Sequence, residues 1–171
     1  SDLVVPDIMT TAKGITNATV PMGAVFVSDS IFETFMGTDV AGVELTHGYT
    51  YSGHPVACAA GMATLDIYER EALFDRPKQL QEHWLDCALA LKGVKNVIDI
   101  RAFALLAAVE MAPRHNEPLQ RGAEAAKYCY ENGVWVRNIG DSLVLSPPLI
   151  ISEEEISQIF NVIGNAIEMV S

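Results

Sequence analysis

Long apolar runs and clusters of positive charge are both missing from this 171-residue chain. Its 11 lysines and arginines are outnumbered by 22 aspartates and glutamates, which leaves a net charge of −11. Because nucleic-acid binding needs basic patches, this balance disfavours a nucleic-acid partner. No apolar run reaches the roughly 18 residues of a membrane span. No charged segment followed by an apolar one marks a secretory signal, so we expect no membrane partner either.

Cysteine is scarce, and the motifs of several common chemistries are absent. Cys58, Cys87 and Cys129 lie far apart in apolar surroundings, which predicts reduced core residues of a cytoplasmic protein. His47 and His54 lack the spacing of metal ligands, so we expect no metal site and interpret both as hydrogen-bonded structural residues. The patterns C-x-x-C, G-x-G-x-x-G, G-K-[ST] and G-x-S-x-G do not occur.

The hydropathy pattern divides the chain into residues 1–71 and 72–171. In the second part we expect a helix at about 78–92, strands at 96–101 and 105–111, and a helix at 119–132. Two further strands at 134–137 and 143–145 and a last helix, which starts at the capping box of Ser152 and Glu155, complete the order. This order predicts an α+β layer with a mostly antiparallel sheet covered on one face.

Residues 1–71 show a different pattern and are not expected to form a self-sufficient domain. We expect a short strand before Lys13, a buried strand at 24–27 and a short helix capped by Ser28. Residues 37–48 are interpreted as an irregular connection, and residues 55–70 as a helix.

Lys13 is the first candidate for chemistry. It is the first of only five lysines, and the apolar residues of 8–15 around it predict a buried segment. Burial favours the neutral amine of lysine, which is a nucleophile that forms imines with aldehydes. Gly14 lets another group approach the backbone closely. The alternative is a lysine at a strand end with its ammonium in water.

Residues 47–55 form the second candidate, a segment rich in hydroxyls, histidines and glycines directly before a helix. Pro55 suits a first helical turn. Free backbone N–H groups and the helix dipole favour a phosphate at such a position, whereas the alternative is an ordinary helix cap. The apolar face of this helix is predicted to comprise Val56, Ala60, Ala63 and Ile67.

A predicted hairpin at residues 134–145 carries the third candidate, Arg137. We expect Arg137 to end the first strand, with Trp135 and Arg137 on one face and Val134 and Val136 on the other. From the residues alone, Arg137 either pairs with Asp141 at the surface or binds a carboxylate.

The chain resembles the class III pyridoxal-phosphate (PLP) aminotransferases, most closely the omega-amino acid:pyruvate (beta-alanine:pyruvate) group. The motifs that carry the resemblance are residues 12–17, 21–24, 47–61, 96–101 and 136–141. The segment 47–61 is the most specific of them. Two positions at which the family often has glycine are occupied by Ala18 and Ala104.

The resemblance implies a role for each candidate. Lys13 corresponds to the Schiff-base lysine that holds PLP and then moves a proton. Thr50 corresponds to a threonine that reaches the phosphate of the partner's cofactor in a homodimer. Arg137 corresponds to the arginine that binds a substrate carboxylate.

The resemblance also implies a fragment, because the chain has no Met at its start and lacks the family's upstream phosphate-binding turn, stacking aromatic and aspartate. The implied fold is α/β and α+β, the C-terminal part of a fold type I PLP-dependent transferase. Residues 1–71 would belong to its large PLP-binding domain with an interdomain helix, and residues 72–171 would form its small domain.

The implied reaction transfers an amino group from an omega-amino acid or amine to pyruvate, although the isolated fragment is expected to be inactive. The alternatives are another class III PLP enzyme, such as a mutase or decarboxylase, and a non-catalytic α+β binding module.

Overall fold

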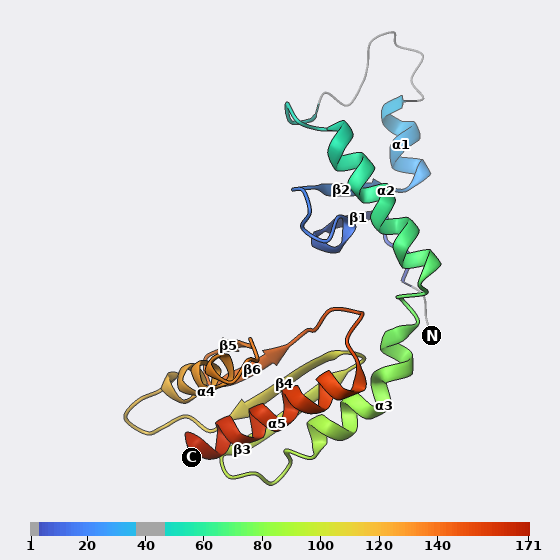
Figure 1. The fold of residues 1–171 in the computed structure, drawn as a ribbon. Helices are drawn as coiled ribbons and strands as arrows, with labels where there is room; N and C mark the ends of the chain where they lie inside the picture. Colours follow the sequence, from blue (N-terminus) through green and yellow to red (C-terminus); the bar gives the residue numbers. More distant parts are fainter. Residues whose placement is uncertain (1–3, 37–46) are drawn as a thin grey trace. The chain divides into compact units, whose positions relative to one another are not determined.

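A computed structural model describes residues 4–36 and 47–171 of the chain. The chain divides into two compact units, Ser1–Glu71 and Ala72–Ser171, and each is described by itself (Figure 1). Most of the expected connection at 37–48 lies outside the described residues. None of the helices in the described parts is long and apolar enough to cross a membrane.

The first unit consists of a strand pair and two helices. Strand β1 (Ile8–Ala12) pairs antiparallel with β2 (Gly23–Val27), which sets Ile8 opposite Val27 and Ala12 opposite Gly23. A short 3-10 turn, η1 (Lys13–Ile15), follows β1 directly. Helix α1 (Asp29–Met36) follows β2, and helix α2 (Pro55–Arg70) ends the unit. The predicted strand before Lys13, the strand at 24–27 and the helix at 55–70 are confirmed.

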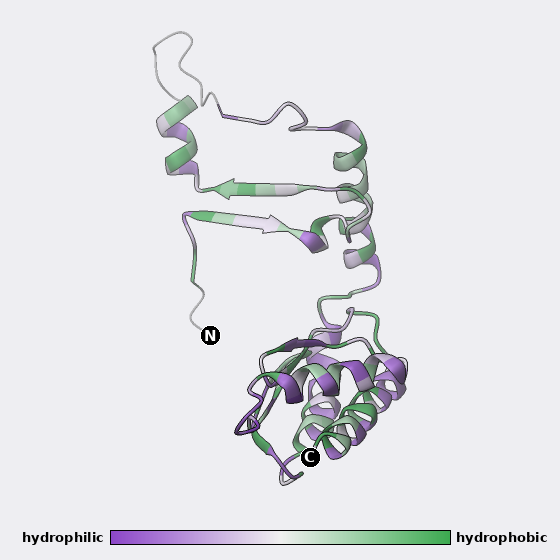
Figure 2. Cartoon of the chain, turned by 90° about the vertical axis from the view of Figure 1, so that its left-hand side faces the viewer, coloured by the Kyte–Doolittle hydropathy of each residue, from purple (hydrophilic) through white to green (hydrophobic). Residues whose placement is uncertain are grey.

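The apolar side chains of β1 and β2 are exposed, so the prediction that these segments are buried is wrong for this chain. Ile8 is 57% exposed and Phe26 is 51% exposed, and Figure 2 shows apolar stretches in both strands. A two-stranded sheet cannot shield its own faces and is marginally stable in water. The described part of this unit therefore has very little hydrophobic core.

The second unit is a four-stranded antiparallel sheet in the order β3-β4-β6-β5 with helices on one face (Figure 1). Its elements are α3 (Arg76–Leu89), β3 (Val97–Phe103), β4 (Leu106–Met111), α4 (Gln120–Glu131), β5 (Arg137–Ile139), β6 (Ser142–Leu145) and α5 (Glu153–Met169). The opposite face stays open, since Phe103 and Leu106 are exposed. The α+β layer expected from the element order is confirmed.

The core of the second unit lies between the sheet and the helices. Trp84 of α3 is fully buried, its ring meets that of Phe160 edge-on at 4.9 Å, and its Nε1 donates to the carbonyl oxygen of Leu106 at 3.2 Å. The predicted capping box is confirmed, because Ser152 Oγ accepts from the N–H of Glu155 and the Glu155 carboxylate accepts from the N–H of Ser152. Aromatic and aliphatic burial of this kind supplies most of the stability of a domain.

The three cysteines are unpaired but do not share one environment. Cys129 is buried, and this burial raises the pKa of its thiol from 9.0 to about 11, so the thiol is protonated at neutral pH. Cys87 is half-buried, whereas Cys58 is exposed on α2. The expectation of a core position is therefore wrong for Cys58.

The turn between β3 and β4 offers a test of backbone strain. Phe103 pairs with Leu106, and the two-residue loop starts with Ala104 at a φ of +52°, in the left-handed region that favours glycine. We expect Ala104→Gly to stabilise the second unit by about 1 kcal/mol, measured as a higher midpoint of urea unfolding. Ala102→Gly in the adjacent strand is the control and should destabilise it. An unchanged or lower midpoint for Ala104→Gly would contradict the assignment of strain.

Candidate functional site

Lys13 occupies a tight turn where β1 ends. Its φ is +56°, and the following residues Asn17 and Ala18 also have positive φ. The left-handed region is uncommon for residues with a side chain, and clusters of such residues mark positions that the surrounding structure holds in place. The side chain of Lys13 is exposed, so the buried environment predicted for it is not formed by this chain.

Helix α2 supports the Lys13 turn from one side. The hydroxyl of Tyr68 donates to the carbonyl oxygen of Gly14 at 2.7 Å. A Cβ on Gly61 would lie only 3.4 Å from Met22 Sδ and 3.7 Å from the carbonyl oxygen of Ile15. The helix therefore packs at van der Waals distance from the segment after Lys13, with room for no more than a small side chain at position 61.

A hydrogen bond inside the loop after Lys13 completes this support. Thr16 is almost fully buried, and its hydroxyl donates to the carbonyl oxygen of Val20 at 2.7 Å. A buried hydroxyl needs such a partner, so this bond keeps the loop in one conformation.

The buried face of α2 differs from the one predicted. The sequence pattern predicts the stripe of Val56, Ala60, Ala63 and Ile67, but the residues buried in the structure are Ala57, Gly61 and Thr64. Helical periodicity identifies an apolar stripe, yet the neighbour decides which stripe is covered. The backbone around Lys13 comes close to α2, and only the stripe of small residues admits it.

Thr50 lies in a turn just before α2. The turn is closed by the N–H of Tyr49, which donates to Ser52 Oγ at 2.9 Å, and by the N–H of Ser52, which donates to the carbonyl oxygen of Tyr49 at 2.9 Å. The side chain of Thr50 is exposed. The hydroxyl of Ser52 thus stabilises the turn by accepting a hydrogen bond within it.

The N-terminus of α2 has no side-chain cap. His54 stands at the N-cap position, and its side chain makes no capping hydrogen bond. The alternative of an ordinary helix cap is therefore wrong for this segment. A 16-residue helix with an uncapped N-terminus presents N–H groups and a partial positive charge to an anion.

Lys13 and Thr50 are associated with different ends of α2. Thr50 precedes Pro55, whereas the residue after Lys13 is bonded to Tyr68. The separation of 13 positions between Pro55 and Tyr68 corresponds to about 20 Å along a helix. The structure of the first unit thus does not bring the two candidates together.

Arg137 is the first residue of β5 and pairs with Val144 of β6, so the expectation that it ends a strand is wrong. The predicted alternation is confirmed, since Trp135 is 89% exposed and Arg137 is exposed, while Val134 and Val136 are buried. The four consecutive residues alternate in this way because the chain is extended before β5 begins.

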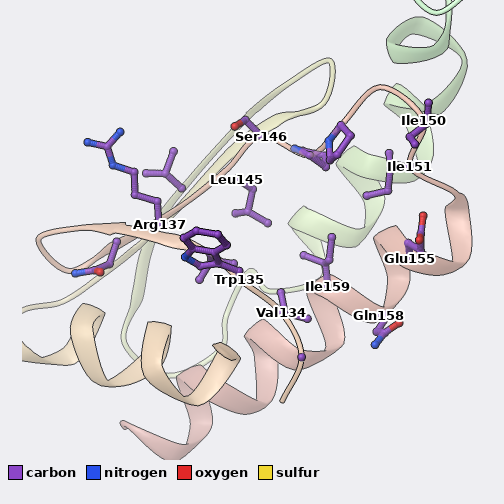
Figure 3. A pocket seen from close by; sticks show the side chains of 16 residues that line it. Val134, Trp135, Arg137, Leu145, Ser146, Ile150, Ile151, Glu155, Gln158 and Ile159 are labelled. Carbon is purple, nitrogen blue, oxygen red and sulfur yellow. The ribbon is translucent and has the colours of Figure 1, made fainter. Parts of the chain in front are cut away.

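Arg137 lines an open pocket of about 920 Å³ in the second unit, together with residues of the segment before α5 and of α5 itself. In Figure 3 the Trp135 ring stands among the lining side chains, and the guanidinium of Arg137 extends away from Glu155 and Ile159. Arg76 fixes the segment before α5 that also lines the pocket, because its Nε and Nη2 donate to the carbonyl oxygens of Leu149 and Ile151 at 2.7 Å each.

Asp141 does not pair with Arg137, so this alternative for Arg137 is wrong. One carboxylate oxygen of Asp141 accepts from the N–H of Leu119 at 3.0 Å and the other from the N–H of Gly122 at 2.9 Å. Asp141 thereby caps the N-terminus of α4 from the hairpin turn. Among the residues that the structure describes, Arg137 forms no ion pair, so its guanidinium is available to a carboxylate.

Gly122 and Tyr68 were missed by reasoning from the sequence. A Cβ on Gly122 would lie 2.1 Å from the carbonyl oxygen of Gly140, so the turn of the Arg137 hairpin rests directly on α4. A glycine within a predicted helix is a signal for such a close approach. No comparable signal marks Tyr68, because its partner is 54 residues away.

Comparisons with known proteins agree on one family. Residues 1–167 match the family described as aminotransferase class III. An omega-aminotransferase of Caulobacter vibrioides is 41% identical over 167 residues, which cover 98% of this chain and 38% of that protein. A beta-alanine–pyruvate aminotransferase of Pseudomonas aeruginosa is 44% identical over 166 residues, covering 96% of this chain and 37% of that protein.

Solved structures show the same likeness. An amine transaminase from an uncultivated Pseudomonas species in its PLP-bound form superposes with a TM-score of 0.89 at 31% identity, covering 98% of this chain and 39% of that chain. A transaminase from the marine bacterium Virgibacillus gives a TM-score of 0.87 at 35% identity, covering 98% of this chain and 40% of that chain. The chain thus spans about two fifths of the length of these relatives.

Proposed function

Because the chain belongs to the class III aminotransferases, we propose that the protein containing it transfers an amino group from an omega-amino acid or amine to pyruvate, with PLP as its cofactor. The fold is part of a fold type I transferase, in agreement with the expectation from the sequence. The observation that carries the proposal is Lys13, an exposed amine in a turn held against α2. The names of the relatives support the choice of substrates.

The residues of the first unit fit PLP by the chemistry of their donors. PLP carries an aldehyde and a phosphate, and the unit offers a primary amine at Lys13 and an uncapped helix N-terminus after Thr50. Lys13 would hold the aldehyde end of one cofactor, and Thr50 would bind a phosphate.

The mechanism assigns distinct tasks to Lys13 and Arg137. When bound, PLP supplies an electron sink for the substrate carbon that carries the amine. Lys13 would hold the aldehyde end of PLP and, as a neutral amine, would take the proton from that carbon. Arg137 would orient the substrate by two parallel hydrogen bonds to its carboxylate, which a lysine cannot form.

We propose that the two units are parts of two domains. Residues 1–71 would belong to the large PLP-binding domain with α2 as an interdomain helix, and residues 72–171 would form the small domain. The boundary between Glu71 and Ala72 supports this division. The exposed apolar side chains of β1 and β2 support the view that the first unit is one portion of a larger sheet.

Thr50 is proposed to bind the phosphate of the partner's cofactor in a homodimer. A hydrogen bond to a dianion contributes roughly 1.5–3 kcal/mol. We therefore expect Thr50→Ala in the full-length protein to weaken PLP binding about ten- to a hundredfold, as measured by equilibrium dialysis of the apoprotein. Thr50→Ser is the matched control, because it keeps the hydroxyl. Mixed dimers of Thr50→Ala and Lys13→Ala subunits should retain one intact site, and a loss of both sites would contradict the cross-subunit role.

Arg137 is proposed to select substrates that carry a carboxylate. We expect Arg137→Ala to lower kcat/KM for beta-alanine and for pyruvate by about a hundredfold, because a charge-assisted bidentate contact is lost. The half-reaction with an uncharged amine such as phenylethylamine should change much less. Stopped-flow absorbance of each half-reaction provides the measurement. Arg101→Ala in β3, the opposite edge strand of the sheet, is the control. An equal loss with both donors would remove Arg137 from the substrate site.

The reaction itself is tested by product analysis of the full-length protein. Beta-alanine and pyruvate should give alanine and the matching oxo acid in equal amounts. A mutase would isomerise the donor without consuming pyruvate, and a decarboxylase would release CO₂. A non-catalytic module would neither bind PLP nor convert either substrate, so these outcomes separate the alternatives.

A further inference from the structure

The hydroxyl of Tyr68 bonds to the peptide group next to Lys13. It donates to the carbonyl oxygen of Gly14 at 2.7 Å and joins positions 54 residues apart within the first unit. Tyr68 is half-buried near the end of α2. This contact ties the residue after Lys13 to a 16-residue helix, the longest regular element described in this unit.

The Lys13 turn needs such a restraint. Lys13, Asn17 and Ala18 all have positive φ, and without external support residues with side chains leave this region for the extended or right-handed one. A change of backbone conformation at Lys13 or Gly14 would redirect the side chain that carries the amine. Covalent chemistry depends steeply on placement, and a displacement of about 1 Å can lower a rate a hundredfold.

We propose that Tyr68 is a positioning residue for Lys13: its hydrogen bond to Gly14 sets the direction in which the amine leaves the turn and so favours the covalent link between Lys13 and PLP. The inference rests on the proposed function, because it takes PLP as the partner of Lys13. It goes further in assigning a role to a residue that acts through the peptide group after Lys13.

Gly14 takes part in the same contact between Tyr68 and the Lys13 turn. A Cβ at this position would lie 3.2 Å from the hydroxyl of Tyr68, so the hydroxyl would have to shift by a few tenths of an ångström and its bond to the carbonyl oxygen would change in length or direction. Without a side chain at Gly14 the bond forms with no such adjustment. Substitutions at Gly14 and Tyr68 should consequently affect the amine through one shared contact and be non-additive.

The test compares two cofactor forms on the full-length apoprotein. PLP links covalently to the lysine, whereas pyridoxamine phosphate has the same ring and phosphate but no aldehyde. We expect Tyr68→Phe to weaken PLP binding about three- to tenfold, as for the loss of one hydrogen bond, and to leave pyridoxamine phosphate binding unchanged. Tyr130→Phe, which removes an exposed hydroxyl from α4, is the matched control and should change neither.

A double-mutant cycle makes the test specific. Gly14→Ala should weaken PLP binding relative to pyridoxamine phosphate in the wild-type background and have a smaller effect in the Tyr68→Phe background. An equal loss of both cofactor forms in Tyr68→Phe would show a merely structural role and overturn the inference, as would unchanged PLP binding. Borohydride reduction of the wild type, followed by mass spectrometry, separates the proposed role of Lys13 from that of Tyr68. A label on another lysine overturns the role of Lys13 itself. A label on Lys13, together with unchanged PLP binding by Tyr68→Phe, overturns only the role of Tyr68.

Discussion

Lys13→Ala is expected to lower amino transfer by the full-length protein by at least about a thousandfold. The substitution removes both the covalent attachment of the cofactor and the amine that moves the proton, and a positioned acid or base alone contributes roughly 10²–10⁴ in rate. Steady-state formation of alanine from pyruvate measures the loss. The exposed side chain of Lys13 contributes no core packing, so the fold should be unaffected, as measured by circular dichroism.

Lys78→Ala is the matched control for this prediction. Lys78 is an exposed lysine on α3 of the second unit, and its removal should leave activity and cofactor labelling unchanged. After borohydride reduction the cofactor should be found on the peptide of Lys13. Residual activity of Lys13→Ala above about a tenth of the wild-type rate would be incompatible with acid–base catalysis by this amine.

Gly122→Ala is expected to destabilise the second unit by about 3 kcal/mol, because overpacking against backbone forces shifts of the chain. The added Cβ would lie 2.1 Å from the carbonyl oxygen of Gly140 and 2.8 Å from the Cα of Asp141. Relief requires the hairpin turn to move away from α4, which also breaks the bond between the N–H of Gly122 and Asp141. Urea unfolding followed by tryptophan fluorescence measures the effect, since Trp84 lies in this core.

Gly164→Ala provides the comparison within the same unit. Gly164 is inside α5, and a Cβ there would meet only the Cδ2 of Leu91 at 3.3 Å, a terminal methyl group and not backbone. Alanine also has a higher helix propensity than glycine by about 1 kcal/mol. We expect this variant to be as stable as the wild type or slightly more stable. If the two variants lost equal stability, the clash with the hairpin turn would not be the cause.

Local patterns were sufficient for most elements of the second unit. The apolar positions of α5 recur at helical spacing, and its start is set by Ser152 and Glu155, which lie three residues apart. The sequence alternation at 134–137 correctly placed Trp135 and Arg137 on one face and Val134 and Val136 on the other. These predictions succeeded because periodicity and capping depend on residues close in sequence.

The contacts of the candidate site residues could not be predicted from local sequence patterns. The sequence identified Lys13, Thr50 and Arg137 as candidates, and their roles stay predictions. It could not indicate that Tyr68 bonds to Gly14, because the two residues are 54 positions apart. Nor could it show that Asp141 serves Leu119 and Gly122, since a carboxylate beside an arginine equally suits an ion pair.

The sequence by itself thus determined the order of helices and strands, the amphipathic faces of the second unit and the residue types available for chemistry. Tertiary structure alone decided which face of α2 is covered, that Lys13 is exposed in this chain, and that Arg137 has a free guanidinium among the described residues. The physical reason is that secondary structure follows short-range spacing, whereas burial and hydrogen-bond partners depend on which distant segments meet.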